Sequence, residues 1–501
     1  MKKILLILVV LLSAMCVYAQ NTQSLGVVYS LGIFNSTITD GVVVGSGEYV
    51  LTTRNAIFEE TNQTKNGKIV KTYGHINKYP LFLSNETGDI YECETVAVDK
   101  ASDLALLKLP KKLTYTNQIE ENTSKFPDGT FKVLYKGKKL ISNYYGIDRN
   151  DETGDFFLKE FASKTGLLET TYSGSKVYMC DVDKNYLLPG GMYIKDKKFY
   201  GILNIMQPLT DYNVKPAKEV VGGQFSLGKE MIKYCKDNNI PFENGETVAG
   251  NDNSKLSYLK NINNIINGVI LYGSKETQEA YDAYPLKDAS YYANILLAMS
   301  YEGENKIEDA KKYYEKAISI LPEAPYAQMR LANLKGDKIT LLNKLSEKYP
   351  NDSRIYDRLA RCYAEQENYE MARSFISRGL MFSENDPEML LEKAKYEKGL
   401  KNYDGVWNAI NEINKIAPTY IDALIFAAKF AIEIKDVNSA VAVCKQWLRV
   451  EPYSPLANAT MANACFLAGE TQLGKEYLDK AKEPNEETKK YIDELESSFV
   501  K

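Results

Sequence analysis

The C-terminal half of the chain carries small residues at a spacing that few folds can produce. Alanines recur at intervals of 34, 28, 34, 34 and 34 residues, at Ala298, Ala332, Ala360, Ala394, Ala428 and Ala462. Most are followed twelve positions later by a second small residue, at Ala310, Ala372, Ala440 and Gly474. Prolines at Pro322, Pro418 and Pro452 are placed to end helices between units. This period predicts a solenoid of helix pairs, in which each unit buries its apolar face against its neighbours.

Departures from the period indicate where the array changes. The unit from Pro325 to Pro350 is six residues short, so its turn or its second helix is expected to be trimmed. Residues 256–287 have the pattern of a degenerate leading helix pair that could cap the array against the preceding domain. The charged segment from Glu486 to Val500 is typical of a polar terminal cap. We therefore assign residues 256–501 to the solenoid.

The preceding 215 residues have a different pattern. Between residues 20 and 236, short runs rich in Val, Ile, Tyr, Phe and Thr alternate with Gly, Asn and Asp clusters, which predicts an all-β domain of sandwich or barrel type. Residues 237–255 are polar and rich in turn formers, and we interpret them as a linker that permits domain motion.

The first nineteen residues have the pattern of a signal peptide. Lys2 and Lys3 precede an apolar run, and Val17-Tyr18-Ala19 resembles a cleavage site. The sequence thus predicts an exported protein, periplasmic or extracellular. Met15 stands before Cys16 where lipoprotein signals have a smaller residue, which argues against lipidation. No later stretch is long and apolar enough to predict a transmembrane segment.

Composition excludes several classes of function. With 62 basic and 66 acidic residues the chain lacks the basic surplus of nucleic-acid-binding proteins. It has one histidine, no CxxC pair and no Gly-rich phosphate loop, so no metal and no cofactor is predicted. The six cysteines after the signal peptide are interpreted as buried thiols. The disulfide state of Cys93, Cys180 and Cys235 stays open, with Cys93 to Cys180 as the one pairing to test.

Three segments of the β region, taken in order, resemble the trypsin-like serine peptidases, especially the bacterial DegP and HtrA branch. They are Val44-Gly45-Ser46-Gly47 with the following Tyr49 to Ile57, then Val98 to Lys108, and finally Leu187 to Met192 with the strand at Gly201-Ile202. The resemblance implies a double β-barrel. It also places the family's general base at Asn55, its orienting aspartate at Asp103 and its nucleophile at Pro189.

The residues at these positions cannot support serine peptidase chemistry. Attack on a carbonyl needs a hydroxyl, a base and backbone donors for the oxyanion. Pro189 has neither a hydroxyl nor a backbone N–H, and the Asn55 amide is no base near neutral pH. Other candidates are interpreted as loop or core residues: His75, Ser173, Ser175 and Cys180. We predict that residues 187–192 keep the position of a nucleophile loop near Asn55 and Asp103 but perform no covalent chemistry.

The helical half resembles the tetratricopeptide repeat, in which the residue after the first small residue of each unit projects toward a binding face. Here those residues include a ladder of donors: Arg361, Lys395, Lys429 and Asn463. Such a ladder suits a protein or an extended, acidic peptide. The alternative is a solvated face on which the cations pair with nearby acidic residues such as Asp357 and Asp422.

Two classes of function follow. The preferred hypothesis is an exported, non-enzymatic interaction scaffold built from an inactive trypsin-like domain and a tetratricopeptide solenoid. The alternative is an active serine-type endopeptidase with a displaced nucleophile. In a further variant of the first hypothesis the β domain is purely structural and only the solenoid binds.

Overall fold

The computed structural model describes most of the chain in two compact units. Its described ranges are 21–31, 36–65, 68–124, 126, 142–150, 152–163, 167–172, 175–181, 189–211, 218–481 and 484–499. The predicted signal peptide lies outside these ranges. The first unit contains residues 1–59 and 76–336, and the second contains residues 60–75 and 337–501.

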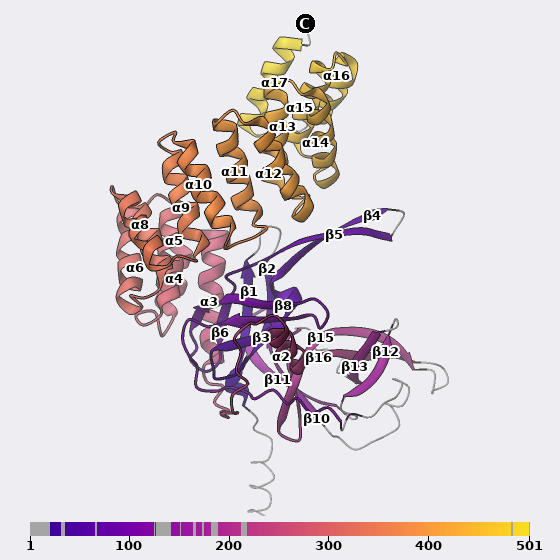
Figure 1. Cartoon of the computed structure of the whole chain (residues 1–501), viewed down its shortest axis with the longest axis vertical. Helices are drawn as coiled ribbons and strands as arrows, with labels where there is room; N and C mark the ends of the chain where they lie inside the picture. Colours follow the sequence, from indigo (N-terminus) through magenta and orange to yellow (C-terminus); the bar gives the residue numbers. More distant parts are fainter. Residues whose placement is uncertain are drawn as a thin grey trace, which may run out of the picture. The chain divides into compact units, whose positions relative to one another are not determined.

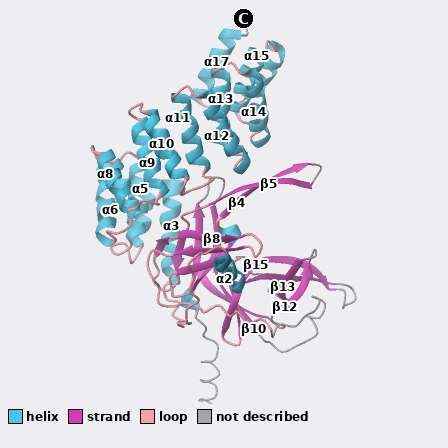
Figure 2. Ribbon diagram, viewed as in Figure 1, coloured by secondary structure: helices cyan, strands magenta, loops and turns pink. Residues whose placement is uncertain are grey.

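Two antiparallel sheets form the β part of the first unit (Figures 1 and 2). The described strands of the first sheet lie in the order β7 (Ile90–Glu92), β6 (Leu81–Ser84), β1 (Leu25–Leu31), β2 (Ser36–Val44), β3 (Tyr49–Thr53), β9 (Leu104–Lys108) and β8 (Glu94–Asp99). Those of the second lie in the order β11 (Phe156–Ser163), β10 (Ser142–Arg149), β14 (Met192–Lys195), β15 (Lys198–Asp211), β16 (Lys218–Leu227), β13 (Ser175–Asp181) and β12 (Leu168–Tyr172). A separate hairpin joins β4 (Phe58–Lys65) to β5 (Lys68–Ile76).

Each sheet curls because its two outermost strands are consecutive in the chain. Only Cys93 separates β7 from β8, and only residues 164–167 separate β11 from β12. In a flat seven-stranded sheet the outer strands would stand about 29 Å apart, because neighbouring strands are about 4.8 Å apart. One to four residues cannot span that distance at about 3.5 Å per residue. The predicted β region is therefore a pair of curled sheets.

The stretch predicted to be a flexible linker is hydrogen-bonded to the β region. It follows helix α2 (Gly228–Asp237). The backbones of Thr116 and Val248 exchange two hydrogen bonds, of 3.1 and 3.0 Å. The side chain of Asn244 bonds both the N–H and the carbonyl of Ile119, each at 2.9 Å. Polar residues that indicated mobility in the sequence thus serve as hydrogen-bonding groups along an extended segment.

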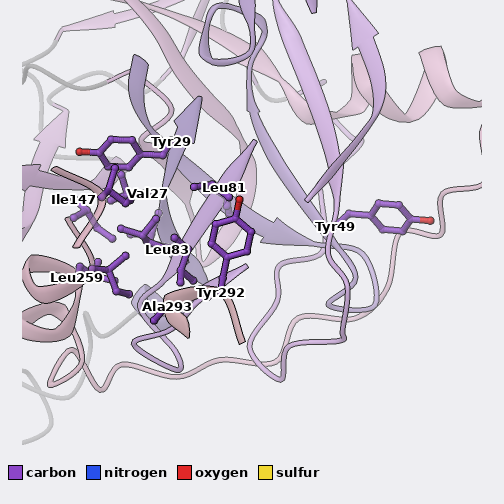
Figure 3. Packing of buried hydrophobic residues seen from close by; sticks show 14 of the residues in the cluster. Val27, Tyr29, Tyr49, Leu81, Leu83, Ile147, Leu259, Tyr292 and Ala293 are labelled. Carbon is purple, nitrogen blue, oxygen red and sulfur yellow. The ribbon is translucent and has the colours of Figure 1, made fainter. Parts of the chain in front are cut away.

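The first helices continue the core of the sheets. They are α3 (Leu256–Asn267), a π-helical turn (Gly268–Tyr272), α4 (Ser274–Ala283), α5 (Tyr291–Gly303), α6 (Ile307–Ile320) and α7 (Pro325–Asn333). Figure 3 shows side chains of the shared core, which come from β1, β6, β10, α3 and α5: Val27, Tyr29, Leu81, Leu83, Ile147, Leu259, Tyr292 and Ala293. The leading helix pair predicted at residues 256–287 is present, and its first helix packs on the sheets.

Buried polar groups fix this junction between β7 and the helices. The carboxylate of Asp89 accepts hydrogen bonds from the Ser290 hydroxyl at 2.5 Å and the Tyr284 hydroxyl at 3.2 Å. The Tyr284 hydroxyl also lies 2.8 Å from the Gly88 carbonyl, to which it donates. Burial raises the pKa of Asp89, although these hydrogen bonds act in the opposite direction. The Asp89 carboxyl therefore releases its proton at a higher pH in the folded unit than in the unfolded chain.

Replacing Asp89 tests this linkage between protonation and folding. Because the folded-state pKa lies above the ordinary value, the stabilising effect of this group is present at low pH and is lost as pH rises from about 4 through the folded-state pKa. Asp89→Asn keeps an acceptor but removes the titration. We expect the difference in unfolding free energy, wild type minus Asp89→Asn, to fall as pH rises, measured by urea unfolding between pH 4 and 7.

Asp155 provides the matched control. It is exposed, and its ion pair with Lys260 at 2.9 Å lowers its pKa, so its contribution is lost as pH falls. Asp155→Asn should shift the pH dependence in the opposite direction. Equal pH profiles for Asp89→Asn and wild type would contradict the assignment.

The second unit contains the remaining helices of the array, stacked one after another in Figure 1. They are α8 (Lys338–Lys348), α9 (Ser353–Ala364), α10 (Tyr369–Leu380), α11 (Pro387–Gly399), α12 (Tyr403–Ile416), α13 (Ile421–Glu433), α14 (Val437–Val450), α15 (Pro455–Leu467), α16 (Thr471–Lys480) and α17 (Glu486–Phe499). The small residues of the predicted register are buried where helices meet: Ala360, Ala372, Ala394, Ala428, Ala440 and Ala462 are all fully buried. The predicted short unit is also present, but α7 is trimmed to 9 residues as well as α8 to 11, so the shortening is not confined to the turn or the second helix.

The turn inside each helix pair repeats one strained backbone position. Glu367, Lys401, Lys435 and Gly469 have φ values of 57°, 56°, 58° and 80°. They are 34 residues apart, so the same left-handed turn recurs with the period of the repeat. A residue with a Cβ is strained in this conformation by about 1–2 kcal/mol, whereas glycine adopts it freely.

Introducing glycine at this position of the turn should stabilise the protein, and removing glycine from it should destabilise the protein. Lys401→Gly should raise the unfolding free energy by about 0.5–1 kcal/mol, because relief of strain exceeds the added entropy of the unfolded chain. Gly469→Ala should lower it by a similar amount, and nothing lies within 4 Å of the added Cβ, so the cost reports the backbone alone. Chemical denaturation of the two variants measures both effects, and destabilisation by Lys401→Gly would contradict the explanation.

Two further sequence expectations bear on the described residues. All six cysteines from Cys93 onward are buried thiols. Cys93 lies in a core cluster of the first sheet and Cys180 in one of the second, so the disulfide considered from the sequence is not formed. Among the helices that the structure describes, none has the length and apolarity required to cross a membrane.

Candidate functional site

Two of the three positions predicted from the peptidase resemblance are adjacent through the backbone. Asn55 lies in a 3-10 turn (Arg54–Ala56) that follows β3, and its side chain is exposed. Asp103 precedes β9 and has a left-handed backbone with φ 56°. The N–H of Arg54 donates to the carbonyl of Asp103 at 3.0 Å, so β3 and β9 bring these segments together.

The third position forms a tight turn against β2. The Pro189 carbonyl accepts a hydrogen bond of 2.8 Å from the N–H of Asp40, and the Gly190 N–H donates to the Leu203 carbonyl at 2.7 Å. Gly190 has a φ of 96°, and a Cβ there would stand 2.1 Å from the Asp40 carbonyl oxygen. Glycine is therefore required for the close approach. Leu187 and Leu188 of the predicted loop lie outside the described residues.

Asn204 connects this turn to Asp103, and sequence analysis did not identify it. It follows Leu203, and its side-chain amide lies 3.2 Å from the Asp103 carboxylate, to which it donates. The same nitrogen lies 2.6 Å from the Ser226 hydroxyl, which itself donates to the Ser102 carbonyl. The sequence feature that could have pointed to Asn204 is that it is a single polar residue within the apolar run Ile202 to Met206.

The structure thus brings the three segments to one place without assembling a triad. The Asp103 carboxylate receives an amide donor rather than an imidazole. Ser226 is buried with 7% of its surface exposed, and its hydroxyl is held by Asn204 and Ser102. His75, at the end of β5, is buried and affects the pKa of Asp386 in the second unit. Ser175 opens β13, and Ser173 lies outside the described residues.

The contribution of this network can be measured with a double-mutant cycle. Asn204→Ala and Ser226→Ala should each lower the unfolding free energy by about 1–3 kcal/mol, because each leaves a buried polar group without its partner. The double variant should cost less than the sum of the two, since the 2.6 Å hydrogen bond between them is lost only once. Strict additivity in chemical denaturation would show that the two side chains act independently.

The four residues of the predicted donor ladder have different surroundings in the structure. The Arg361 guanidinium bonds Asp357 at 3.0 Å and Glu392 at 3.1 Å, and the Lys395 ammonium bonds the same Glu392 at 2.7 Å. The first two cations therefore already bind carboxylates on α9 and α11. This arrangement corresponds to the alternative interpretation of a face with internal ion pairs.

The last two residues of the ladder have different surroundings. Asn463 donates from its amide to the Tyr491 hydroxyl at 2.8 Å, so it joins α15 to the terminal helix α17. Lys429 is exposed and has no ion-pair partner within 4.0 Å among the described residues. The four residues do not form one continuous row of available donors.

Carboxylates outnumber cations on the surface formed by α9, α11 and the start of α13. We call this surface the α9–α13 face, and define it by Asp357, Arg361, Asp386, Glu388, Glu392, Lys395, Tyr396, Tyr420 and Asp422. Asp386 caps α11 by accepting from the N–H groups of Glu388 and Met389. Burial raises the pKa of Asp386, and the nearby Asp357 carboxylate adds to this effect, while His75 opposes it.

Similar effects act on other residues of the face. Partial burial and the carboxylates of Asp386 and Asp357 raise the pKa of Glu388. Burial raises the pKa of the Tyr420 hydroxyl, and four carboxylates add to it: Glu388, Asp422, Asp386 and Glu392. The Arg361 guanidinium acts in the opposite direction and lowers the pKa of Glu388.

Among the residues that the structure describes, no group of three or more His, Cys, Asp or Glu side chains is arranged to hold a metal ion. A pocket of about 310 Å³ lies in the first unit between β7 and the helices α5 to α7. The hydroxyls of its two tyrosines are bonded elsewhere: that of Tyr91 donates to Thr87 at 2.9 Å, and that of Tyr291 accepts from the Ala327 N–H at 3.0 Å. Its walls are thus largely apolar.

Comparison with known proteins identifies the repeat. The family model for the tetratricopeptide repeat matches residues 291–323, which contain α5 and α6. Together with the 34-residue register, this match makes the helical array a tetratricopeptide repeat region. A comparison with curated proteins gives no significant match.

Solved structures similar to parts of the chain include both repeat proteins and peptidase domains. A tetratricopeptide repeat protein from Parabacteroides merdae is 17% identical with a TM-score of 0.35, over 47% of this chain and 97% of that one. PilF from Pseudomonas aeruginosa is 17% identical with a TM-score of 0.30, over 36% and 86%. The MamO protease domain from Magnetospirillum magneticum is 15% identical with a TM-score of 0.26, over 43% and 98%. At these TM-scores the likenesses carry no conclusion about function.

Proposed function

We propose that this protein is an exported, non-enzymatic interaction scaffold. In this proposal the tetratricopeptide repeats bind an extended segment of a partner protein, and the β region is a trypsin-like domain that has lost catalysis. One observation carries the second part: the carboxylate of Asp103 accepts a hydrogen bond from the amide of Asn204. The residue that the resemblance aligns with the nucleophile is Pro189, which has no hydroxyl.

The trypsin-like assignment draws support from topology and from segment order. Two curled antiparallel sheets follow one another in the chain. The Gly190 turn belongs to the second sheet region and packs on Asp40 of the first, so the three triad segments meet between the sheets. This is the place where the resemblance puts a catalytic centre. The signal-peptide pattern of residues 1–19 supports export.

The alternative is a serine-type endopeptidase with a displaced nucleophile. Ser226 is the serine hydroxyl beside the Asp103 network that would favour it. A nucleophile must reach a substrate carbonyl and transfer its proton to a base. Ser226 is buried, and its hydroxyl donates to the Ser102 carbonyl, which is no base. We therefore favour the scaffold.

Peptidase assays distinguish the two functions. We expect the mature protein to hydrolyse fluorescein-labelled casein no faster than its Asp103→Ala variant, and no residue to be labelled by a fluorophosphonate probe. The reason is that neither a nucleophile nor a base occupies the triad positions. Hydrolysis that Asp103→Ala abolishes, or a probe adduct mapped to one serine, would establish the endopeptidase instead.

The binding half of the proposal has a separate test. Crosslinking mass spectrometry of the exported fraction should map partner crosslinks to lysines of the repeats, such as Lys395 and Lys429. Crosslinks confined to lysines of the β region, such as Lys78 and Lys159, would contradict binding by the repeats. If crosslinks occur in both regions but most of them map to the repeats, the β region is chiefly structural.

A further inference from the structure

Three consecutive large apolar side chains are exposed just after α3. Ile270, Leu271 and Tyr272 have 51%, 64% and 67% of their surface exposed. Among the residues that the structure describes, no other run of three large apolar side chains is exposed. Single exposed apolar residues are common on protein surfaces, but a contiguous group is typical of a contact site. We call these three residues the apolar tip.

The apolar tip lies in the π-helical turn between α3 and α4 (Gly268–Tyr272). The Gly273 N–H closes this turn by donating to the Gly268 carbonyl, five residues earlier, at 2.8 Å. Both glycines are required: a Cβ on Gly268 would stand 2.6 Å from the Thr277 hydroxyl oxygen, and Gly273 has a φ of 120°. π-helical turns are rare and occur frequently at functional sites. A specific backbone conformation therefore exposes the tip.

Polar contacts from the end of α5 hold the turn from behind. The Glu304 carboxylate accepts hydrogen bonds from the N–H and the hydroxyl of Ser274, both at 2.6 Å. Lys306 donates to the same hydroxyl at 2.8 Å and pairs with Glu304 at 2.7 Å. The Thr277 hydroxyl donates to the Gly273 carbonyl at 2.6 Å. Because the backbone is fixed in advance, little conformational entropy is lost when the tip makes a contact.

The side chains of the apolar tip surround the turn instead of lining one side of it. Consecutive residues of a helical turn are about 100° apart, and slightly less in a π turn, so the tip covers roughly half of the circumference. The preceding Val269 packs against the core, which leaves the tip on the outer side. A helix that binds in a protein groove presents residues three and four apart along a single stripe. Contact with all three consecutive residues requires a medium that surrounds the turn.

The surroundings of the apolar tip carry no net charge. Residues 261–274 contain no charged side chain, and the adjacent Lys275 and Glu276 have opposite charges. Glu304 and Lys306 neutralise each other in the same way. An uncharged turn can enter the boundary between lipid headgroups and acyl chains, because no charge has to leave water. A stable protein interface, by contrast, uses about 20–30 residues on each side, so the tip by itself is too small to hold a second copy of the chain.

We infer that the apolar tip inserts into the interfacial region of a lipid bilayer and holds the protein reversibly at a membrane surface. Ile270 and Leu271 enter the acyl boundary, and Tyr272 lies at the level of the headgroups, where tyrosine is enriched. Because the tip has no cation to attract anionic lipids, zwitterionic lipids suffice. The inference goes beyond the proposed scaffold, since it assigns a place of action and does not depend on what the repeats bind.

Vesicle sedimentation of the full mature chain tests the inference. The probes are vesicles of phosphatidylcholine alone and of phosphatidylcholine mixed with phosphatidylglycerol. We expect partition coefficients that agree within about twofold for the two compositions and that do not fall as salt rises. Replacing the tip by Ile270→Ser, Leu271→Ser and Tyr272→Ser should lower the partition coefficient by at least about tenfold, because the apolar area that leaves water is removed.

A matched variant controls for the general loss of exposed apolar surface. Met381→Ser with Tyr453→Ser removes side chains that are 73% and 91% exposed on the repeats, and it should leave the partition coefficient unchanged. Urea unfolding of both variants should match wild type, since only exposed side chains change. Equal effects of the two variants on partitioning would overturn the inference.

A fluorescent reporter measures insertion directly. Tyr272→Trp should shift its emission to the blue on phosphatidylcholine vesicles and should be quenched by lipids brominated on their acyl chains, because the indole leaves water. Tyr453→Trp has the same two native tryptophans, Trp407 and Trp447, and should show neither change.

The remaining outcomes separate a membrane from other partners. Absence of folded protein from both kinds of vesicle pellet would overturn the inference. Binding confined to vesicles with phosphatidylglycerol, and equal for wild type and the serine variant, would show electrostatic adsorption and would also overturn it. Self-association that the serine variant abolishes, without vesicle binding, would assign the tip to a second copy instead. None of these results decides the proposed scaffold, which crosslinking to the repeats tests separately.

Discussion

Close approach of helices at small side chains is the constraint on which the repeat array depends. Ala360 and Ala372 are fully buried where α9 and α10 meet, and Ala394, Ala428, Ala440 and Ala462 are fully buried in the later helix pairs. At the second of these positions the α11–α12 pair carries Val406, which is also fully buried, so the first position is the one that is alanine in every pair from α9 onward. Because each unit contacts mainly its neighbours, one such position repeated along the chain determines the register of the whole array.

The periodic parts of the fold were predictable from the sequence because their causes are local. The spacing of small residues predicted the repeat register and the short unit. The short runs of strand-forming residues between clusters of turn formers predicted the strands. The hydrogen bonds of the connector at residues 237–255 were not predictable, because composition does not reveal hydrogen-bond partners. Asn244 is typical of a turn, yet it bonds Ile119 more than a hundred residues away. Long-range pairing of this kind leaves no local pattern.

Segment order indicated which parts of the β region to compare with one another, but not the contacts between them. The structure connects the backbone segments that carry Asn55, Asp103 and Pro189 through hydrogen bonds. Gly190 explains why the turn keeps its shape, since the Asp40 backbone leaves no room for a Cβ. Asn204 was missed because its role depends on a strand that returns from a separate part of the chain. The glycine of this turn is therefore explained by packing alone.

The donor ladder shows what a sequence register can place and what it leaves out. Spacing placed Arg361 and Lys395 on α9 and α11, and the structure leaves them on one face. Their charge, however, is balanced by Asp357 and Glu392, one of which lies on the neighbouring repeat. Neutralising pairs between repeats are not visible from one register position alone. Once those pairs are assigned, the register alone no longer decides which charges the face presents to solvent, because each cation has to be followed to its own partner.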